Sequence, residues 1–334
     1  MISVFILFLK IFAGMPLLAL VVLLALLFEG ADRIVNAKMQ RRYGPPLLQP
    51  VYDILKLMGK ENIVPRRASR FFFMTAPWLT LVTTLMIFLY IPTGSFPPVL
   101  GTEGDMVLIV YLLAMSGLLM AVGGFASGNP LASIGAGREI TLMMSYEFPL
   151  AIVVCTMAWV AHRLGLPGEP FSLEPFAAVS VWKAVGKTGV MGLICLFLSL
   201  VLVVPGELGK GPMDIPEAKT EILDGLIIEY SGVNLALFKL TFALRSFAMA
   251  TFMTALFVPV SLGSLLGVSG FIVAIFDFIF FWAKVLVVQM IFVTLMRTMF
   301  GRLKIWQASQ FYIMKVAGLS IAGMILLSID VIAR

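Results

Sequence analysis

The sequence is poor in charged residues and nearly lacks the side chains that bind metals. Only 13% of its 334 residues are Asp, Glu, Lys or Arg, whereas soluble domains carry about 25%. It contains one histidine, His162, and two cysteines, Cys155 and Cys195, which lie in apolar runs. These residues cannot supply a ligand set for zinc, haem or an iron–sulfur cluster. We therefore expect no metal and no cofactor on this chain itself.

Apolar sequence takes the place of the missing charge. Hydrophobic residues make up 60% of the chain, and the mean hydropathy is +1.04. A helix needs about 20 apolar residues to span a bilayer, and long unbroken runs favour helices over the alternating strands of a barrel. The sequence therefore predicts an all-α polytopic membrane protein, with residues 1–334 as one integral membrane domain. The eight predicted spans are 3–28, 71–92, 106–124, 139–161, 189–205, 232–263, 268–296 and 309–332.

The basic residues predict the orientation of these spans. Residues 29–70, between the first two spans, hold nine Lys and Arg residues. Because such loops stay in the cytoplasm, this one is predicted to be cytoplasmic, and alternation places 206–231 there as well and both termini outside. The net charge of +6 is then a topology signal rather than a nucleic-acid footprint. We expect a multi-pass protein of the cell (plasma) membrane.

The first cytoplasmic loop contains an amphipathic pattern. Apolar residues recur at helical spacing between polar ones, at Leu47, Leu48, Val51, Ile54, Leu55 and Met58. Such a pattern is typical of a helix that lies along the membrane interface.

The second cytoplasmic loop is acidic. Within Glu207–Ser231, Asp214, Glu217 and Glu221 are spaced i, i+3, i+7, so a helix that begins near Asp214 would carry them on one face. Two interpretations are open: a solvated connection, or a docking surface or proton-handling site. The acids of the loop are Glu207, Asp214, Glu217, Glu221, Asp224 and Glu229.

Several charged residues fall inside the predicted spans. Glu139 and Glu147 lie on one stripe of the fourth span, although Glu139 can also be read as an interfacial residue beside Arg138. Asp277 and Lys284 are seven residues apart, which predicts a buried pair. Ionisable residues in a membrane normally face protein or water, and they are candidate functional sites. The sixth span carries Lys239 and Arg245.

Three blocks of sequence resemble one family. The blocks are Asp32-Arg33 through Arg42-Tyr43-Gly44-Pro45, then Gly135-Ala136-Gly137-Arg138-Glu139 with Ser145-Tyr146-Glu147, and Pro212–Ala218 with Glu229-Tyr230-Ser231-Gly232. In this order they resemble the first membrane subunit of respiratory complex I and its homologue in membrane-bound nickel–iron hydrogenases and related ferredoxin-linked complexes.

The resemblance implies a subunit without redox groups that anchors a peripheral arm and couples electron transfer to H⁺ or Na⁺ translocation. The cluster-bearing small and large subunits would sit on the cytoplasmic loops, with iron–sulfur clusters and, in hydrogenases, nickel–iron on those partners. Antiporter-like subunits would lie beside the chain in the lipid bilayer. The implied ion path comprises Asp32, Glu139, Glu147, Glu207, Asp214, Glu217, Glu221 and Glu229, with Arg33, Arg138, Lys239, Asp277 and Lys284 as supporting charges.

Several positions distinguish the branches of the family. Ile34, Lys210, Met213 and Lys219 depart from the pattern of quinone-using members, and 127–136 looks more like the hydrogenase branch. The resemblance therefore favours ferredoxin as electron donor, with protons or a sulfur compound as acceptor. The alternatives are the same role in a sulfur reductase or a quinone-reducing complex I, a scaffold without a part in ion movement, and a stand-alone ion transporter.

Overall fold

The computed structural model describes residues 2–101, 104–261, 263 and 270–333, and over these residues the chain is helical with no named strand. Eight helical segments are long and apolar enough to cross a membrane, as the sequence predicted. They are α1 (Ile2–Met39), α3 (Arg70–Tyr90), α4 (Met106–Ala126), α5 (Pro130–Arg163), α8 (Lys187–Leu208), α10 (Gly232–Phe257), α12 (Phe271–Gln289) continued by η2 (Met290–Thr294) and α13 (Leu295–Met299), and α14 (Ile305–Gln310) continued by η3 (Phe311–Val316) and α15 (Ala317–Ile332).

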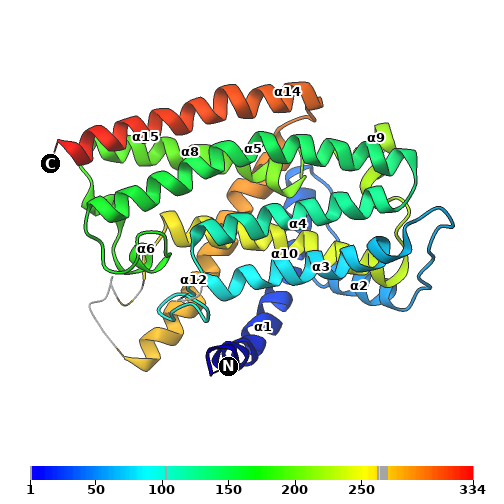
Figure 1. The fold of residues 1–334 in the computed structure, drawn as a ribbon, viewed down its shortest axis with the longest axis horizontal. Coiled ribbons are helices and arrows are strands. Elements are labelled where there is room, and N and C mark those ends of the chain that lie inside the picture. The colour runs from blue at the N-terminus through cyan, green and yellow to red at the C-terminus, as the bar shows by residue number, and fades with distance from the viewer. Residues whose placement is uncertain (1, 102–103, 262, 264–269, 334) are drawn as a thin grey trace.

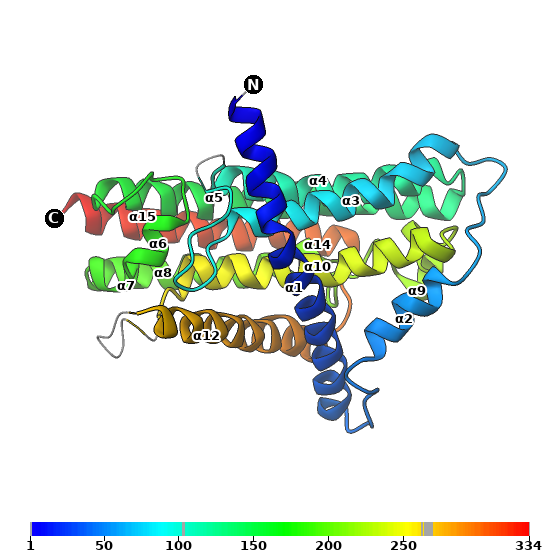
Figure 2. The same cartoon turned by 90° about the horizontal axis from the view of Figure 1, so that it is seen from below.

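Most of these helices run side by side, and α1 crosses them steeply (Figures 1 and 2). Short helices mark the two ends of the bundle. α2 (Gln49–Met58) and α9 (Lys219–Ile222) lie at one end, and α6 (Glu174–Ala178), α7 (Val181–Ala184) and the C-terminus lie at the other (Figures 1 and 2). α10 is the helix most completely buried by its neighbours. The polar residues that α10 carries are therefore mostly inside the protein.

Two helices extend further than hydropathy predicted. α1 runs to Met39 rather than ending near residue 28, so Asp32 and Arg33 lie on the helix and not in a loop. α5 begins at Pro130 rather than at 139, because the Asn129 side chain accepts a hydrogen bond from the Leu131 amide and proline suits the first helical turn. Hydropathy underestimates both helices because the last turns of α1 carry charged residues and the first turns of α5 carry small and polar ones.

The predicted amphipathic helix is confirmed as α2. Pro50 occupies its first turn, and Ile54 and Leu57 are buried where the helix packs against α1 and α10. Tyr52 and Leu55 on another side of the helix stay exposed, as does Met58 at its end. α2 therefore has one apolar face on the protein and a second that is uncovered.

The prediction of a helix that begins near Asp214 is wrong. Gly209 has a φ of +57°, the Gly211–Pro212 peptide is cis, and Leu223 and Asp224 both adopt left-handed conformations. Only α9 and the 3₁₀ turn η1 (Gly225–Ile227) form in this loop. Asp214, Glu217 and Glu221 consequently do not share one helix face, and each lies in a different environment. Residues 262, 268 and 269 of the predicted spans, and residues 264–267 between these spans, lie outside the described residues.

Candidate functional site

Three charged side chains meet inside the bundle and form what we call the central ion cluster: Glu139 of α5, Glu207 of α8 and Arg245 of α10. Arg245 Nη2 lies 3.0 Å from Glu207 Oε1 and donates to the Glu207 carbonyl oxygen at 2.6 Å. Arg245 Nη1 lies 3.7 Å from Glu139 Oε1. All three residues are less than 5% exposed. One guanidinium thus faces two buried carboxylates, and uptake of one proton would make the cluster neutral.

The neighbouring helices make room for this cluster with glycine. A methyl group placed on Gly117 of α4 would lie 3.2 Å from Glu139 Oε1 and 3.3 Å from Arg245 Nη2. On α8, a methyl group on Gly206 would lie 2.5 Å from the Tyr312 hydroxyl. The close approach of α4 and η3 to the cluster therefore depends on these glycines.

Glu217 connects the central ion cluster to a larger opening. A cavity of about 10 Å³ is lined by Glu139, Arg245 and Glu217. Burial, together with the Glu139 and Asp224 carboxylates, raises the pKa of Glu217 to about 8, although Arg245 and Lys219 partly offset this effect. Glu217 can therefore exchange a proton near neutral pH.

The opening beyond Glu217 is a cleft of about 330 Å³, which we call the charged cleft. It lies between α1, α2, α10 and the acidic loop. Its lining contains both signs of charge in equal number, from Glu29, Arg33, Asp53, Lys210, Asp214, Glu217, Lys219, Asp224, Lys239 and Arg297. Water and hydrated ions suit such a lining better than an apolar ligand.

Asp32 is held in a second buried cluster beside this cleft. Thr294 Oγ1 donates to Asp32 Oδ1 at 2.5 Å, and Arg297 Nη1 lies 3.0 Å from Asp32 Oδ2. Lys210 Nζ lies 3.8 Å from Asp32 and 2.8 Å from Glu29. The acidic loop, α1 and α13 are therefore joined through one carboxylate with no exposed surface.

Arg33 ties α1 to α2. Its Nη1 lies 2.8 Å from Asp53 Oδ2, and Gln49 Nε2 donates to the other oxygen at 2.9 Å. Partial burial alone would raise the pKa of Asp53, but the hydrogen bonds from Arg33 and Gln49 outweigh burial and lower it. Asp53 therefore stays ionised at neutral pH and serves as a fixed anchor for α2.

Three other predicted path residues make contacts at the surface end of the bundle. Arg302 forms a bidentate pair with Asp214, at 2.6 and 2.5 Å. Arg138 Nη1 lies 2.7 Å from Glu221 Oε2. The Asn129 side chain donates to Glu229 at 2.5 Å. These contacts hold the acidic loop against α5 and the segment before α14.

Glu147 lies two helical turns beyond Glu139 on α5, outside the central ion cluster. It is partly exposed, whereas Met143 between the two acids is buried. It lines a pocket with Tyr111 and Ala114 of α4, and it makes no hydrogen bond or ion pair with any described residue. Glu139 and Glu147 therefore lie in different surroundings: Glu139 is buried in the central ion cluster, and Glu147 is partly exposed in a pocket beside α4.

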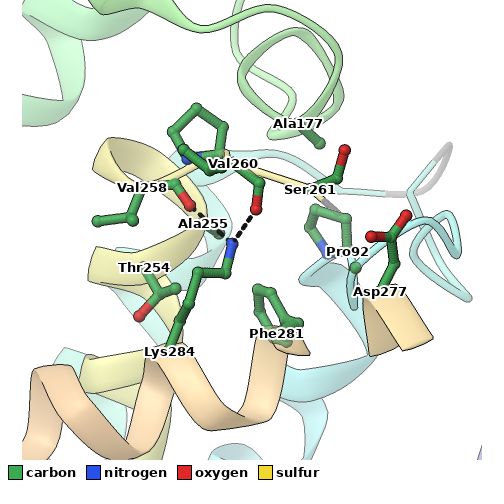
Figure 3. Close-up of a pocket in the computed structure, with 12 residues that line it drawn as sticks. Pro92, Ala177, Thr254, Ala255, Val258, Val260, Ser261, Asp277, Phe281 and Lys284 are labelled. Carbon is green, nitrogen blue, oxygen red and sulfur yellow. Dashed lines mark hydrogen bonds between the residues drawn. The ribbon is translucent and has the colours of Figure 1, made fainter. Parts of the chain in front are cut away.

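Asp277 and Lys284 belong to α12 and line the pocket drawn in Figure 3. Lys284 Nζ donates to the carbonyl oxygens of Val258 and Val260, at 2.9 and 2.7 Å. Asp277 Oδ2 accepts a hydrogen bond from Ser95 at 2.5 Å. Both side chains line a cavity of about 30 Å³. These hydrogen bonds close the C-terminal end of α10 and fasten the loop after α3.

Sequence reasoning missed several members of these clusters. Glu29, Lys210 and Arg297 were not among the predicted site residues, since they resembled helix-end or topology charges. Arg245 was noticed in the sixth span but was not assigned a partner. An isolated arginine in an apolar helix is itself a signal, because it requires a buried acid from another helix.

The described part of the chain offers no arrangement of three or more His, Cys, Asp or Glu side chains that could hold a metal ion. Cys155 is exposed on α5, and Cys195 is partly buried on α8. The acids that do gather lie beside arginine or lysine, as Glu139 and Glu207 lie beside Arg245. Their geometry suits proton exchange rather than metal binding.

Comparison with known proteins places the chain in a family. The family model described as NADH dehydrogenase matches residues 12–328. The chain belongs to this family. It is 30% identical to hydrogenase-4 component C of Escherichia coli (strain K12) over 72% of this chain and 73% of that protein. It is 35% identical to an NADH-quinone oxidoreductase subunit from Geobacillus sp. (strain WCH70) over 75% of this chain and 74% of that protein.

A solved structure has the same fold. A chain of the membrane-bound sulfane sulfur reductase, an archaeal respiratory membrane complex, superposes with a TM-score of 0.80 at 24% identity. The match covers 95% of this chain and 99% of that one. The resemblance inferred from the three sequence blocks is confirmed, with relatives in both the hydrogenase and the NADH-quinone branches.

Proposed function

We propose that the chain is the membrane subunit that anchors the iron–sulfur and catalytic arm of a ferredoxin-linked respiratory complex of the membrane-bound hydrogenase type. In this role it couples electron transfer to H⁺ or Na⁺ translocation. Cluster-bearing small and large subunits bind at the end that carries α2 and α9, and antiporter-like subunits lie beside the helices. The hydrogenase and oxidoreductase components among its relatives support this assignment.

The observation that carries the proposal is the position of Glu217 between the charged cleft and the central ion cluster. Glu217 lines both the cleft and the small cavity that contains Glu139 and Arg245. Carboxylates this close in a low-dielectric setting titrate together. Electron arrival on a cluster above the cleft adds negative charge, which raises proton affinity at Glu217 and then at Glu139 or Glu207. The proposed path also includes Asp32 and Glu147, together with Asp214, Glu221 and Glu229 in and beside the acidic loop.

The test measures ion translocation per electron with the whole complex in sealed vesicles. Glu217→Gln and Glu139→Gln should keep electron transfer but lower the number of ions moved per electron. Glu61→Gln is the matched control, because Glu61 is an exposed acid outside the predicted path. If all three variants translocate like the wild type, the chain is a scaffold and the proposal fails.

The charged lining of the cleft is unfavourable for a quinone as electron acceptor. Ten charged side chains surround it, so an isoprenoid quinone would have to desolvate several of them. This favours ferredoxin as donor with protons or a sulfur compound as acceptor. The complex should therefore be purified in mild detergent, analysed for nickel and iron, and assayed for hydrogen evolution from reduced ferredoxin. Iron without nickel or hydrogen indicates a sulfur reductase or a quinone enzyme, and no metal-bearing partner indicates a stand-alone transporter.

A further inference from the structure

Tyr312 of η3 carries a buried hydroxyl that bonds to the backbone of α8. The residue has no exposed surface. Its hydroxyl donates to the Leu202 carbonyl oxygen at 3.2 Å, and the Gly206 amide forms a hydrogen bond with the same hydroxyl. In an unbroken helix this amide and this carbonyl bond to each other, since they are four residues apart. Tyr312 therefore bridges the two groups of one helical turn of α8.

The bridged turn is the one in which α8 reaches the central ion cluster. Pro205 lies in this turn and has no amide hydrogen, so it cannot donate to the carbonyl oxygen of Val201. Glu207 follows Gly206 directly, and its carboxylate and its carbonyl oxygen both accept from Arg245. The course of the last turn of α8 therefore decides how Glu207 meets the arginine.

The helix that carries Tyr312 is irregular at this position. The Ala317 amide donates to the Tyr312 carbonyl oxygen five residues back, which is the pattern of a π-helix. Such turns are frequent at functional sites. The preceding turn, α14, is fastened to α5, because the Ser309 and Ser145 hydroxyls lie 3.0 Å apart. α14 and η3 thus contact both helices that supply the acids of the central ion cluster.

Gly206 makes room for the bridge. A methyl group on Gly206 would lie 2.5 Å from the Tyr312 hydroxyl and 3.0 Å from the ring of Tyr146. The two rings pack edge to face, with their centroids 6.1 Å apart. Two aromatic side chains from different helices therefore close on the backbone of the residue that precedes Glu207.

We propose that Tyr312 is a positioning residue for ion coupling, whose hydroxyl holds the last turn of α8 so that Glu207 meets Arg245. The inference rests on the proposed function, in which Glu207 exchanges a proton. A role in packing alone would need only the aromatic ring, which fills the space beside α5 and α8. The backbone of α8 needs the hydroxyl, so the ring and the hydroxyl can be tested separately.

The first test removes the hydroxyl and keeps the ring. In the intact complex, Tyr312→Phe should speed hydrogen exchange of the amides of residues 206–209 about fivefold, the factor that corresponds to one ordinary hydrogen bond of about 1 kcal/mol. Ser320→Ala is the matched control, because it removes the buried hydrogen bond between Ser320 of α15 and Ser199 of α8. It should leave this exchange unchanged. Exchange at the wild-type rate in Tyr312→Phe would overturn the proposal.

The second test measures the ions moved per electron by the same variants of the complex in sealed vesicles. Tyr312→Phe should lower this number, whereas Ser320→Ala should not. Tyr312→4-aminophenylalanine should restore it, because the amino group donates and accepts hydrogen bonds at the same place on the ring. No loss with Tyr312→Phe, or a loss that 4-aminophenylalanine does not restore, would overturn the proposal.

Glu217→Gln, measured in the same vesicles, separates this inference from the proposed function. A loss of translocation with Glu217→Gln and none with Tyr312→Phe would leave the proposed function standing while this inference fails. Wild-type translocation by both variants would contradict both.

Discussion

Arg245 places a permanent positive charge at the most buried part of the molecule. The guanidinium stays protonated in proteins, so its environment must supply negative charge. Glu207 and Glu139 do so from two other helices. The arginine also keeps the two acids from being adjacent unpaired charges, and it thereby allows one of them to change protonation without loss of the fold.

Replacing Arg245 by methionine should destabilise the chain by about 3–5 kcal/mol, because two buried acids lose their shared partner. Thermal unfolding of the purified complex measures the change. Lys239→Met on the same helix is the control, since Lys239 is exposed. Adding Glu207→Met to Arg245→Met should recover part of the loss. A double variant less stable than Arg245→Met alone would contradict this account.

The raised pKa of Glu217 predicts a pH dependence of stability. The folded protein holds this proton up to about pH 8, whereas the unfolded carboxyl releases it near its ordinary pKa of 4.5. Between these values the folded state binds more protons, so stability falls as pH rises. Glu217→Gln should remove this part of the slope, which thermal unfolding at pH 5.5 and pH 8.5 would show. Equal slopes in both proteins would argue that Glu217 is already ionised in the folded state.

The packing of α5 against the acidic loop explains one glycine of the second sequence block. A methyl group at Gly135 would lie 2.8 Å from the Leu226 amide nitrogen and 2.9 Å from the Pro216 carbonyl oxygen. A methyl group at Gly137, two residues further along the same helix, would have no atom within 4 Å. Of these two glycines, only Gly135 is therefore needed for the loop to sit on α5, where it presents Glu217 to Glu139.

Gly135→Ala should displace the loop and destabilise it by about 1–3 kcal/mol, the usual range for overpacking. Limited proteolysis of residues 209–231 in the assembled complex would report the change as faster cleavage. Gly137→Ala provides the control, and its loop should be cleaved at the wild-type rate. Equal cleavage of the two variants would show that the loop tolerates the methyl group.

The bundle as a whole places its loops at two ends, and the basic residues predict which end faces the cytoplasm. A cysteine at Arg42 should react with a membrane-impermeant maleimide only after the cells are opened. A cysteine at Glu169 should react in intact cells, since both positions are exposed and belong to loops at opposite ends. The wild type, with Cys155 and Cys195, gives the background. The reverse labelling pattern would invert the predicted topology.

Hydropathy predicted the eight spans because the bilayer requires a minimum apolar length of each of them. It could not predict that α1 continues past Asp32, since the reason is a partner on η2 and α13 more than 250 residues later. It also could not predict the course of the acidic loop, where Ala218 has a ψ of 96° and so interrupts any helix between Asp214 and Glu221. Which acids meet Arg245 depends on the rotation of three helices about their axes, and no single segment encodes that.

The order of the charged helices along the chain has a consequence for synthesis. α10 has the lowest mean hydropathy of the eight spans, at 1.5, and it carries Arg245. Both acids that receive this arginine, Glu139 and Glu207, are translated before it. Because α5 and α8 are synthesised before α10, their two carboxylates can pair with Arg245 when α10 enters the membrane. Insertion of the least hydrophobic helix is therefore assisted by helices that were made earlier.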